Sequence, residues 1–317
     1  MDKKSYRVRN WKDYNKSLVA RGSITFWFSK EALAGTNYER KSGFYGRPEK
    51  YLNELILAAL TLKQLFNLTL RMTEGLVRSL FELTRSSCEA PHYSTLSKRG
   101  KTLKVSLGVK RPTKSYHVLV DSTGIQVVGE GEWKTLKYGR SKHQLWRKLH
   151  IAMNADDQTI LATEVTEGVR LDGNYLPRLI KKIKAPIYQI TGDGAYDKKN
   201  CYETAFARNA KLIAPPQHDA IVQRNKIKKN PALLARDEVI LLLGEGDEKE
   251  ERRKQWKIAN NYHRRSLIET MMSRHKFIFG DRIRAKSLEN QVTDLTIRCR
   301  IINKMNYLGL PKSVCID

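Results

Sequence analysis

Three acidic residues stand in local sequences that suit chemistry at a phosphodiester. Asp121 follows the apolar run 118–120, Asp193 follows the apolar run 187–191, and Glu269 lies in an arginine-rich segment with helical character. Phosphodiester chemistry requires neutralised charge at phosphorus and an activated water or hydroxyl, and a pair of Mg²⁺ ions supplies both. Hard cations of this kind take carboxylate oxygens as ligands. We therefore predict that the three acids converge on one divalent metal site.

Rigid elements must hold the three carboxylates, because a metal site tolerates little drift. Asp121 and Asp193 are each expected at a strand end, and they face each other if the two strands are neighbours in a sheet. Gly192 and Gly194 flank Asp193. We interpret these glycines as room for a close approach of the backbone to a phosphate.

The third acid belongs to a helical pattern that also carries cations. Tyr262, Arg265 and Glu269 are spaced three and four residues apart, which places them on one helix face. Lys276 follows two turns beyond Glu269. One face thus offers a metal ligand together with cations for phosphates. An ion pair from Arg265 to Glu269 within the helix is the alternative, and it is compatible with a role in orienting the carboxylate.

The charge balance of the chain indicates a polyanionic partner. Lys and Arg number 59, Asp and Glu number 33, the formal net charge is +26 and the pI is about 9.9. Such a field most often serves phosphate backbones. The cations are spread along the whole chain and no apolar stretch approaches the roughly 18 residues of a spanning helix, so we expect no membrane partner. Residues 1–10 lack a signal-peptide segment, and the four distant cysteines fit free thiols in a reducing cytoplasm.

The predicted domains divide the chain into four parts. We expect a basic, aromatic arm over 1–45, a helical DNA-binding domain over 46–110, a catalytic domain over 111–309 with a charged insert near 218–256, and a tail over 310–317.

The helical domain has the pattern of a helix-turn-helix. One helix is expected over 73–83 with Thr73 as its N-cap, and after a turn a second begins at Tyr93. In that motif the second helix presents its N-terminal residues to the major groove. The predicted DNA contacts are Tyr93, Ser94, Thr95, Lys98 and Arg99. An ordinary helical hairpin is the alternative interpretation.

The catalytic part has alternating strand and helix patterns. The expected strands are 117–120, its partner 124–128, then 146–154, 159–165, 186–191 and 211–214; the expected helices are 171–182, 197–209 and two within 257–309. This order predicts an α/β fold, a mixed sheet with helices packed on it.

These motifs together resemble the DDE transposases of bacterial insertion sequences, in the group of insertion sequences four and five. The spacing Tyr262, Arg265, Glu269, Lys276 reproduces the family's third-acid signature without a gap. Residues 121–123 and 193–196 match the patterns around its first two acids, and the likeness spans residues 45 to 305 with no departure at the motif positions.

The resemblance implies a ribonuclease H-like catalytic core in which Asp121, Asp193 and Glu269 bind two Mg²⁺ ions, or Mn²⁺ in their place. It implies that Arg265 and Lys276 contact DNA at the cleaved end. It also implies double-stranded DNA as the partner, both terminal inverted repeats and target, a homodimer in the active complex, and a cytoplasmic, nucleoid-associated location in a bacterium.

Two other functions remain open from the sequence. A regulator derived from a transposase would keep the fold and lose cleavage, although the presence of all three acids argues against it. A tyrosine recombinase would use Tyr307 as nucleophile, but none of the seven histidines has an arginine three residues later, as that chemistry needs. With two metals no protein base is required, so His117, His143, His150 and His263 are weak candidates for one.

Overall fold

The chain folds into two compact units. A computed structural model describes residues 5–29, 32, 50–129, 146–168, 170–223, 230–244, 246 and 248–316. Met1–Gly108 and Arg284–Asp317 form one unit, here called the helical unit, and Val109–Ile283 form the other, called the sheet unit. The predicted boundary at residues 45 and 46 and the candidate His143 lie outside the described residues.

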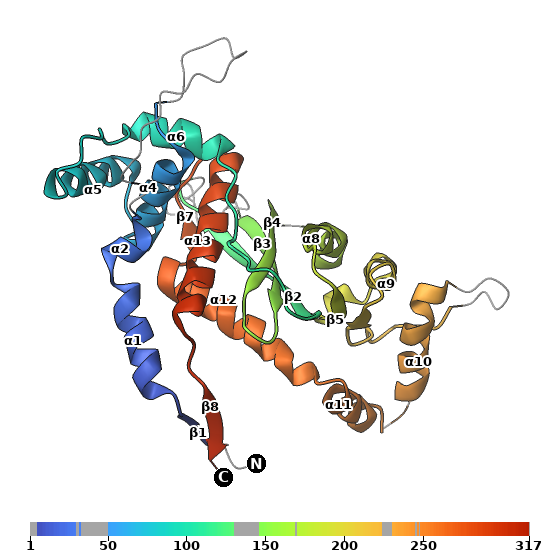
Figure 1. Cartoon of the computed structure of the whole chain (residues 1–317). Coiled ribbons are helices and arrows are strands. Elements are labelled where there is room, and N and C mark those ends of the chain that lie inside the picture. Colours follow the sequence, from blue (N-terminus) through green and yellow to red (C-terminus); the bar gives the residue numbers. More distant parts are fainter. Residues whose placement is uncertain are drawn as a thin grey trace, which may run out of the picture. The chain divides into compact units, whose positions relative to one another are not determined.

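The helical unit gathers helices from both ends of the chain (Figure 1). Its elements are β1 (Ser5–Val8), α1 (Trp11–Arg21), α2 (Ile24–Trp27), α4 (Asn53–Leu65), α5 (Leu70–Leu83), α6 (Tyr93–Thr102), α13 (Leu288–Leu308) and β8 (Ser313–Ile316). Among the described residues no single helix has the length and apolar composition to cross a membrane; α4 and α5 pass that test only as a pair, bent by 115°.

The long helix α13 packs within this unit, while the predicted catalytic domain runs to residue 309. Lys63 on α4 pairs with Asp294 at 2.6 Å. The hydroxyl of Thr293 donates to the carbonyl of Gly100 on α6 at 2.8 Å. These bonds anchor α13 to both helices.

Helix α5 begins earlier than predicted. The hydroxyl of Thr69 accepts from the N–H of Met72 at 3.3 Å, so Thr69 is the N-cap. Thr73, the predicted cap, lies inside the helix and its hydroxyl donates to the carbonyl of Thr69 at 2.8 Å. The apolar residues that follow Thr73 therefore form the second turn onward rather than the first.

The sheet unit is a mixed α/β fold. Its strands are β2 (Tyr116–Val127), β3 (Trp146–Asn154), β4 (Ile160–Glu167), β5 (Ile187–Thr191), β6 (Lys211–Ile213) and the short β7 (Arg282–Ile283). They form one sheet in the order β4-β3-β2-β5-β6, with β7 added to β2. The strands β2, β3 and β4 are antiparallel neighbours, whereas β5 and β7 run parallel to β2 and β6 runs parallel to β5. The predicted mixed sheet is confirmed.

Strand β2 is the central strand, and it differs from the prediction. Residues 117–120 and 124–128 were expected to be two paired strands with a turn between them. Instead β2 runs through this segment and pairs without interruption with β3, from Val118 opposite Asn154 to Gln126 opposite Trp146. A long partner strand thus holds the small and polar residues 121–124 extended, although alone they favour a turn.

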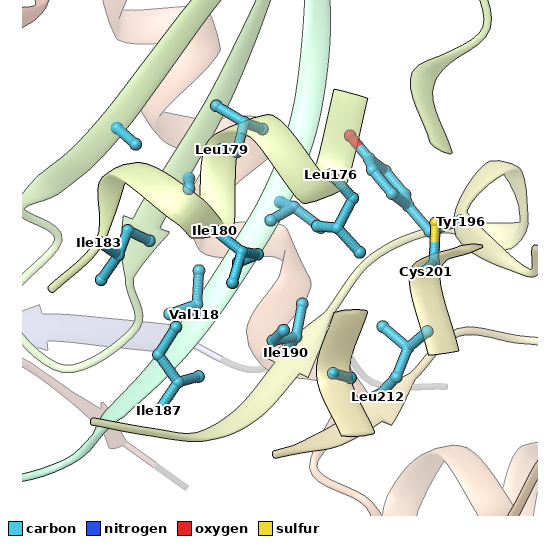
Figure 2. Close-up of a cluster of buried hydrophobic side chains, with 14 of the residues drawn as sticks. Val118, Leu176, Leu179, Ile180, Ile183, Ile187, Ile190, Tyr196, Cys201 and Leu212 are labelled. Carbon is cyan, nitrogen blue, oxygen red and sulfur yellow. The ribbon is translucent and has the colours of Figure 1, made fainter. Parts of the chain in front are cut away.

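The face of the sheet beneath α8 holds an apolar core. Alternate residues of β2, Val118 and Val120, point to this face together with Ile190 of β5, and all three are fully buried. Figure 2 shows Val118, Ile187 and Ile190 facing side chains of α8 (Leu176–Lys182). The helix-side members of this core are Leu176, Leu179, Ile180 and Ile183, joined by Tyr196, Cys201 and Leu212.

The remaining helices of this unit lie between the strands and after them in the chain. They are the 3-10 turn η1 (Asp172–Tyr175), η2 (Gly194–Tyr196), α9 (Lys199–Phe206), η3 (Pro231–Leu233), α10 (Leu234–Leu243), α11 (Lys249–Ala259), η4 (Tyr262–Arg265) and α12 (Ser266–Phe279). The predicted insert at 218–256 contains η3, α10 and most of α11. Helix α12 packs against β2 and lies on the other side of the sheet from α8 and α9 (Figure 1).

Candidate active site

Asp121 lies in the middle of β2, not at a strand end as predicted. On one side β2 pairs with β3 throughout, with Asp121 opposite Ile151. On the other side the pairing with β5 stops at Leu119, and the pairing with β7 begins at Gln126. Between those points the described strands leave this edge of β2 open, and Asp121 sits in the opening. The N–H of Ser122 donates to Oδ1 of Asp121 at 2.7 Å, which fixes the carboxylate.

Asp193 follows β5, and the register of the sheet brings it to Asp121. Leu119 is the register partner of Thr191 in the parallel pair of β2 and β5. Two residues further along both strands come Asp121 and Asp193, on the same face as that pair. Asp193 keeps an extended backbone, and its Oδ1 accepts from the N–H of Ala195 at 3.0 Å. The prediction that the two acids face each other from neighbouring strands is supported by this register.

Gly192 owes its identity to packing inside the protein. A Cβ at this position would lie 2.6 Å from the ring of Tyr196 and 3.0 Å from Val120, both buried in the core. At Gly194 a Cβ would meet only the carbonyl of Pro215, at 3.4 Å. The close approach at Gly192 is therefore to an aromatic ring, and the predicted approach to a phosphate does not explain this glycine.

Glu269 enters from α12, in the first turn of the helix. The 3-10 turn η4 leads directly into α12, so Tyr262, Arg265 and Glu269 follow one another along a helical path as predicted. The guanidinium of Arg265 forms an ion pair with Glu269. It also lies 5.9 Å from the centre of the Tyr262 ring. The alternative of an ion pair within the helix is thus present.

Arg265 does more than pair within its own helix. Its Nη1 lies 3.4 Å from Oδ2 of Asp121. One guanidinium therefore links a carboxylate of the sheet to a carboxylate of α12. This contact brings Asp121 and Glu269 together on the face of β2 opposite the apolar core.

The charges of Asp193 and Glu269 affect the pKa of Asp121. Burial raises the pKa of Asp121 to about 6, and the negative charges of Asp193 and Glu269 add to that rise. The N–H of Ser122 and the positive charge of Arg265 act in the opposite direction. Burial is the larger cause, and the two neighbouring carboxylates add to it against the charge of Arg265.

A hard divalent cation fits this donor set. The three side chains supply only carboxylate oxygens, which Mg²⁺ and Mn²⁺ prefer. As the side chains lie, no three His, Cys, Asp or Glu groups of the described residues are close enough to share one ion. Arg265 instead provides the positive charge between Asp121 and Glu269. The residues suit the metal, while the side-chain positions are those of an arginine-bridged site.

A second arginine, Arg264, fastens the start of α12 to the sheet. Its Nη2 donates to Oδ1 of Asp156, in the turn between β3 and β4, at 2.8 Å. Its Nη1 lies 3.4 Å from Nδ1 of His117. Nε2 of His117 lies 2.8 Å from the hydroxyl of Thr191, two residues before Asp193. Burial, and then the charge of Arg264, lowers the pKa of His117 to about 4, so His117 is a neutral connector.

The exposed side of α12 continues away from Glu269. Thr270, Ser273 and Lys276 are exposed along it. Phe277, next to Lys276, is 90 % exposed, an unusual position for a large aromatic side chain. Lys276 is thus placed, as predicted, on the same helix as Glu269 with its ammonium group open to solvent.

The predicted DNA contacts of α6 lie in the helical unit, and several are already engaged there. Arg99 donates to the carbonyl of Tyr51 at 2.9 Å and to Oδ1 of Asn53 at 2.6 Å. The hydroxyl of Ser94 lies 2.8 Å from Nδ1 of His92. The N–H of Tyr93 donates to Glu74 at 2.8 Å, and the guanidinium of Arg71 covers its ring at 4.6 Å. Of the five, only Lys98 is classed as exposed; Thr95 is half-buried.

Sequence reasoning missed two residues of the sheet unit. Arg264 occupies no position of the helical pattern, and its partner Asp156 is far away in the chain, so spacing gave no signal. Phe277 could have been found from the sequence. Met272 and His275 lie on the buried side of the helix, and Phe277, beside Lys276, falls outside that helical repeat.

Comparison with known families decides the class of the protein. Two profiles with the description "Transposase DDE domain" match the chain, one at residues 19–130 and the other at residues 112–304, more than half its length. The chain belongs to the DDE transposase family. Membership implies DNA transposition by a catalytic transposase domain.

Among solved structures, one that matches is the cryo-EM structure of a piggyBac transposase synaptic complex with hairpin DNA. It shares 12% sequence identity with the transposase described here, over 96% of this chain and 77% of that chain, with a TM-score of 0.41. A likeness this distant assigns no residue or partner to this chain.

Proposed function

We propose that this transposase binds the terminal inverted repeats of its own mobile element, cleaves the DNA ends, and transfers the resulting 3′-hydroxyl to target DNA. In this proposal Asp121, Asp193 and Glu269 are the catalytic carboxylates. The observation that carries it is the convergence of the three from separate elements, through the β2–β5 register and the bridge by Arg265.

A ribonuclease H-like core is part of this proposal, as is membership of the group of insertion sequences four and five. The sheet order supports the first: three antiparallel strands are followed by two parallel ones on the other side of β2. The spacing from Tyr262 to Lys276 supports the second.

Asp121, Asp193 and Glu269 are also the residues that would hold Mg²⁺ or Mn²⁺. Bound there, such ions would neutralise developing charge on a phosphate and favour deprotonation of the attacking hydroxyl. The protein's own groups act around them. Ser122 and Ala195 orient the first two carboxylates by backbone hydrogen bonds, and Arg265 orients the third. Lys276 lies in the open on the same helix, where it would contact a DNA phosphate.

Substrate DNA would be held by the cationic surface. The excess of Lys and Arg supplies affinity through phosphates, which carry no sequence information, while contacts to base edges supply end specificity. Because an element has two ends, we further propose that two copies of the chain act together in the active complex.

The test is cleavage of DNA that carries the element's terminal repeats, with Mg²⁺ present. Asp121→Asn, Asp193→Asn and Glu269→Gln should each lower the rate on the order of 10³-fold or more, and binding of the same DNA should persist. Glu238→Gln, at an exposed position of α10 in the same unit, is the matched control and should keep full activity. Cleavage by any of the three variants at the wild-type rate would exclude that residue from the site.

The same assay separates the proposal from an inactive regulator. A regulator derived from a transposase binds the ends without cutting them, so wild-type protein would then show binding and no cleavage product. Mg²⁺-dependent cleavage by wild-type protein excludes that function.

A further inference from the structure

The two ends of the chain form a small sheet of their own in the helical unit. Strands β1 and β8 pair in antiparallel fashion, from Ser5 opposite Ile316 to Val8 opposite Ser313 (Figure 1). This pair is called the terminal ribbon below. Within the described part of the chain neither strand pairs with a third, so both outer edges are open. A two-stranded ribbon is marginal by itself in water, so its position needs a separate explanation.

The base of the terminal ribbon is firmly attached. The amide of Asn10 donates to the carbonyl of Leu310 at 3.0 Å, and its oxygen accepts from the N–H of Lys312 at 2.7 Å. Next to it, Arg21 of α1 donates to the carbonyl of Gly309 at 2.9 Å. These bonds tie α1 to the end of α13, so the ribbon projects from a fixed root.

The charged residues on one face of the terminal ribbon are all positive. Arg7 is opposite Val314 in the register, and one step further the N–H of Arg9 donates to the carbonyl of Lys312 at 2.8 Å. Because alternate residues share a face, Arg7, Arg9 and Lys312 lie on the same side. Residues 5–12 and 310–316 contain no acidic residue. Among the described residues these three cations form no ion pair.

This arrangement disfavours the free ribbon. Continuing the β1–β8 register by one residue places Arg9 opposite Lys312, and like charges in that position are destabilising. The protein thus holds cations together at a site where nothing described neutralises them. An anionic partner would remove the repulsion.

Aromatic side chains accompany the cations. Tyr6, on the other face of the ribbon, is 65% exposed, and Trp11, at the start of α1, is 56% exposed. A second copy of the chain would bring the same three cations against their own kind, on a protein with a net charge of +26. Charge complementarity therefore favours a polyanion over a second copy.

We propose that the terminal ribbon docks on duplex DNA, with Arg7, Arg9 and Lys312 on its phosphates; this rests on the proposed function of the protein as a DNA-end-binding transposase. The major groove is wide enough for a two-stranded antiparallel ribbon. On α6, by contrast, two of the predicted DNA contacts, Arg99 and Ser94, are bonded within the protein.

The experiment measures binding of a labelled duplex of unrelated sequence over a series of salt concentrations. The triple variant Arg7→Ala, Arg9→Ala, Lys312→Ala should lower affinity by about 10- to 100-fold at low salt, and should reduce the slope of log affinity against log salt by about 2 to 3. The control Lys181→Ala, Lys184→Ala, Lys199→Ala removes the same charge from exposed positions of the sheet unit. Equal losses in both variants overturn the proposal, because the affinity would then follow net charge alone.

A single substitution separates DNA binding from the stability of the ribbon. Lys312→Glu places an opposite charge across from Arg9, so the melting temperature should hold or rise while DNA affinity falls several-fold. DNA affinity equal to that of the wild type overturns the proposal. If the triple variant instead alters sedimentation in the absence of DNA and leaves the salt slope unchanged, the ribbon serves a second copy and the proposal is wrong.

Failure here is distinct from failure of the proposed function. If the wild-type protein cleaves its DNA ends and the triple variant binds duplex DNA as tightly as the wild type, only the ribbon proposal is refuted. Wild-type protein that binds duplex through the ribbon but never cleaves removes only the cleavage proposal.

Discussion

The two faces of the central sheet belong to the same strands but have different roles. Val118 and Val120 of β2 point into the apolar core beneath α8, whereas His117 and Asp121 of the same strand point toward α12. The α8 face also holds ion pairs, from Lys148 to Asp172 and from Lys182 to Glu164. The α12 face holds the carboxylates of Asp121, Asp193 and Glu269 and the guanidinium groups of Arg264 and Arg265.

The difference shows how a repulsive site can be held in place. Ionising the Asp121 carboxylate costs free energy in the folded protein, since burial raises its pKa to about 6. On the α12 face Arg265 links Asp121 to Glu269, and the fully buried side chain of Leu119 lies on that face as well. The apolar contacts of the other face fix the register of β2 and β5, and the register carries the acids with it.

The largest effect is expected from the core face. Leu176 on α8 is fully buried between the sheet and Tyr196. Leu176→Ala should lower the free energy of unfolding by about 3 kcal/mol, because the smaller side chain leaves a cavity. The measurement is urea denaturation, with Leu171→Ala, at an exposed position, as the control. A loss below about 1 kcal/mol would mean that this face does not set the register.

Asp121→Asn should act in the opposite direction and stabilise the metal-free protein. The pKa of Asp121 rises from 3.8 to about 6 on folding, so the folded state binds the proton more tightly than the unfolded state. The ionised carboxylate therefore costs stability above pH 6, about 2 to 3 kcal/mol, and costs nothing below pH 3.8.

The measurement is thermal unfolding in a chelator at several pH values. The gain from Asp121→Asn should be full at pH 7 to 8 and should disappear as the pH falls toward 4. Asp219→Asn, in an exposed loop, is the control and should show no such dependence. A gain that is the same at every pH would show that repulsion of charge at Asp121 is not its source.

Arg264 tests the attachment of η4 and α12 to the sheet. Arg264→Gln should lower single-turnover cleavage about tenfold, which is about 1.4 kcal/mol, because η4 loses its bond to Asp156. Asp156→Asn should give a similar loss, and the double variant should lose no more than either single one. The pKa of His117 should rise in Arg264→Gln, as followed by NMR, since the arginine's charge helps to lower it. Additive losses would mean that the two residues act separately.

The features that could be predicted from the sequence are those set by interactions between residues close together in the chain. The relation of Tyr262, Arg265 and Glu269 follows from helical periodicity, which needs only neighbouring residues, and the structure has it as expected. Strands 146–154, 186–191 and 211–214 were likewise placed within one residue of their observed ends.

What failed was set by distant partners. Residues 121–124 favour a turn by themselves, and only the long pairing with β3 keeps them extended. Thr73 looked like a cap because the apolar pattern was read from the wrong turn, whereas Thr69 makes the bond. The packing of α13 on α4 depends on Lys63 and Asp294, which no local pattern connects.

The smallest effect is expected at the open end of α12, where the charged face meets solvent. Lys276 is exposed there beside Phe277, and one lysine makes one phosphate contact. Lys276→Gln should reduce the slope of log affinity against log salt by about 0.9 and weaken DNA binding a few-fold, without changing stability. Lys254→Gln, exposed on α11, removes the same charge elsewhere in the unit and should leave the slope unchanged. Equal slopes for Lys276→Gln and wild-type protein would contradict the prediction. They would mean that Lys276 contacts no DNA phosphate and that the helix beyond Glu269 takes no part in DNA binding.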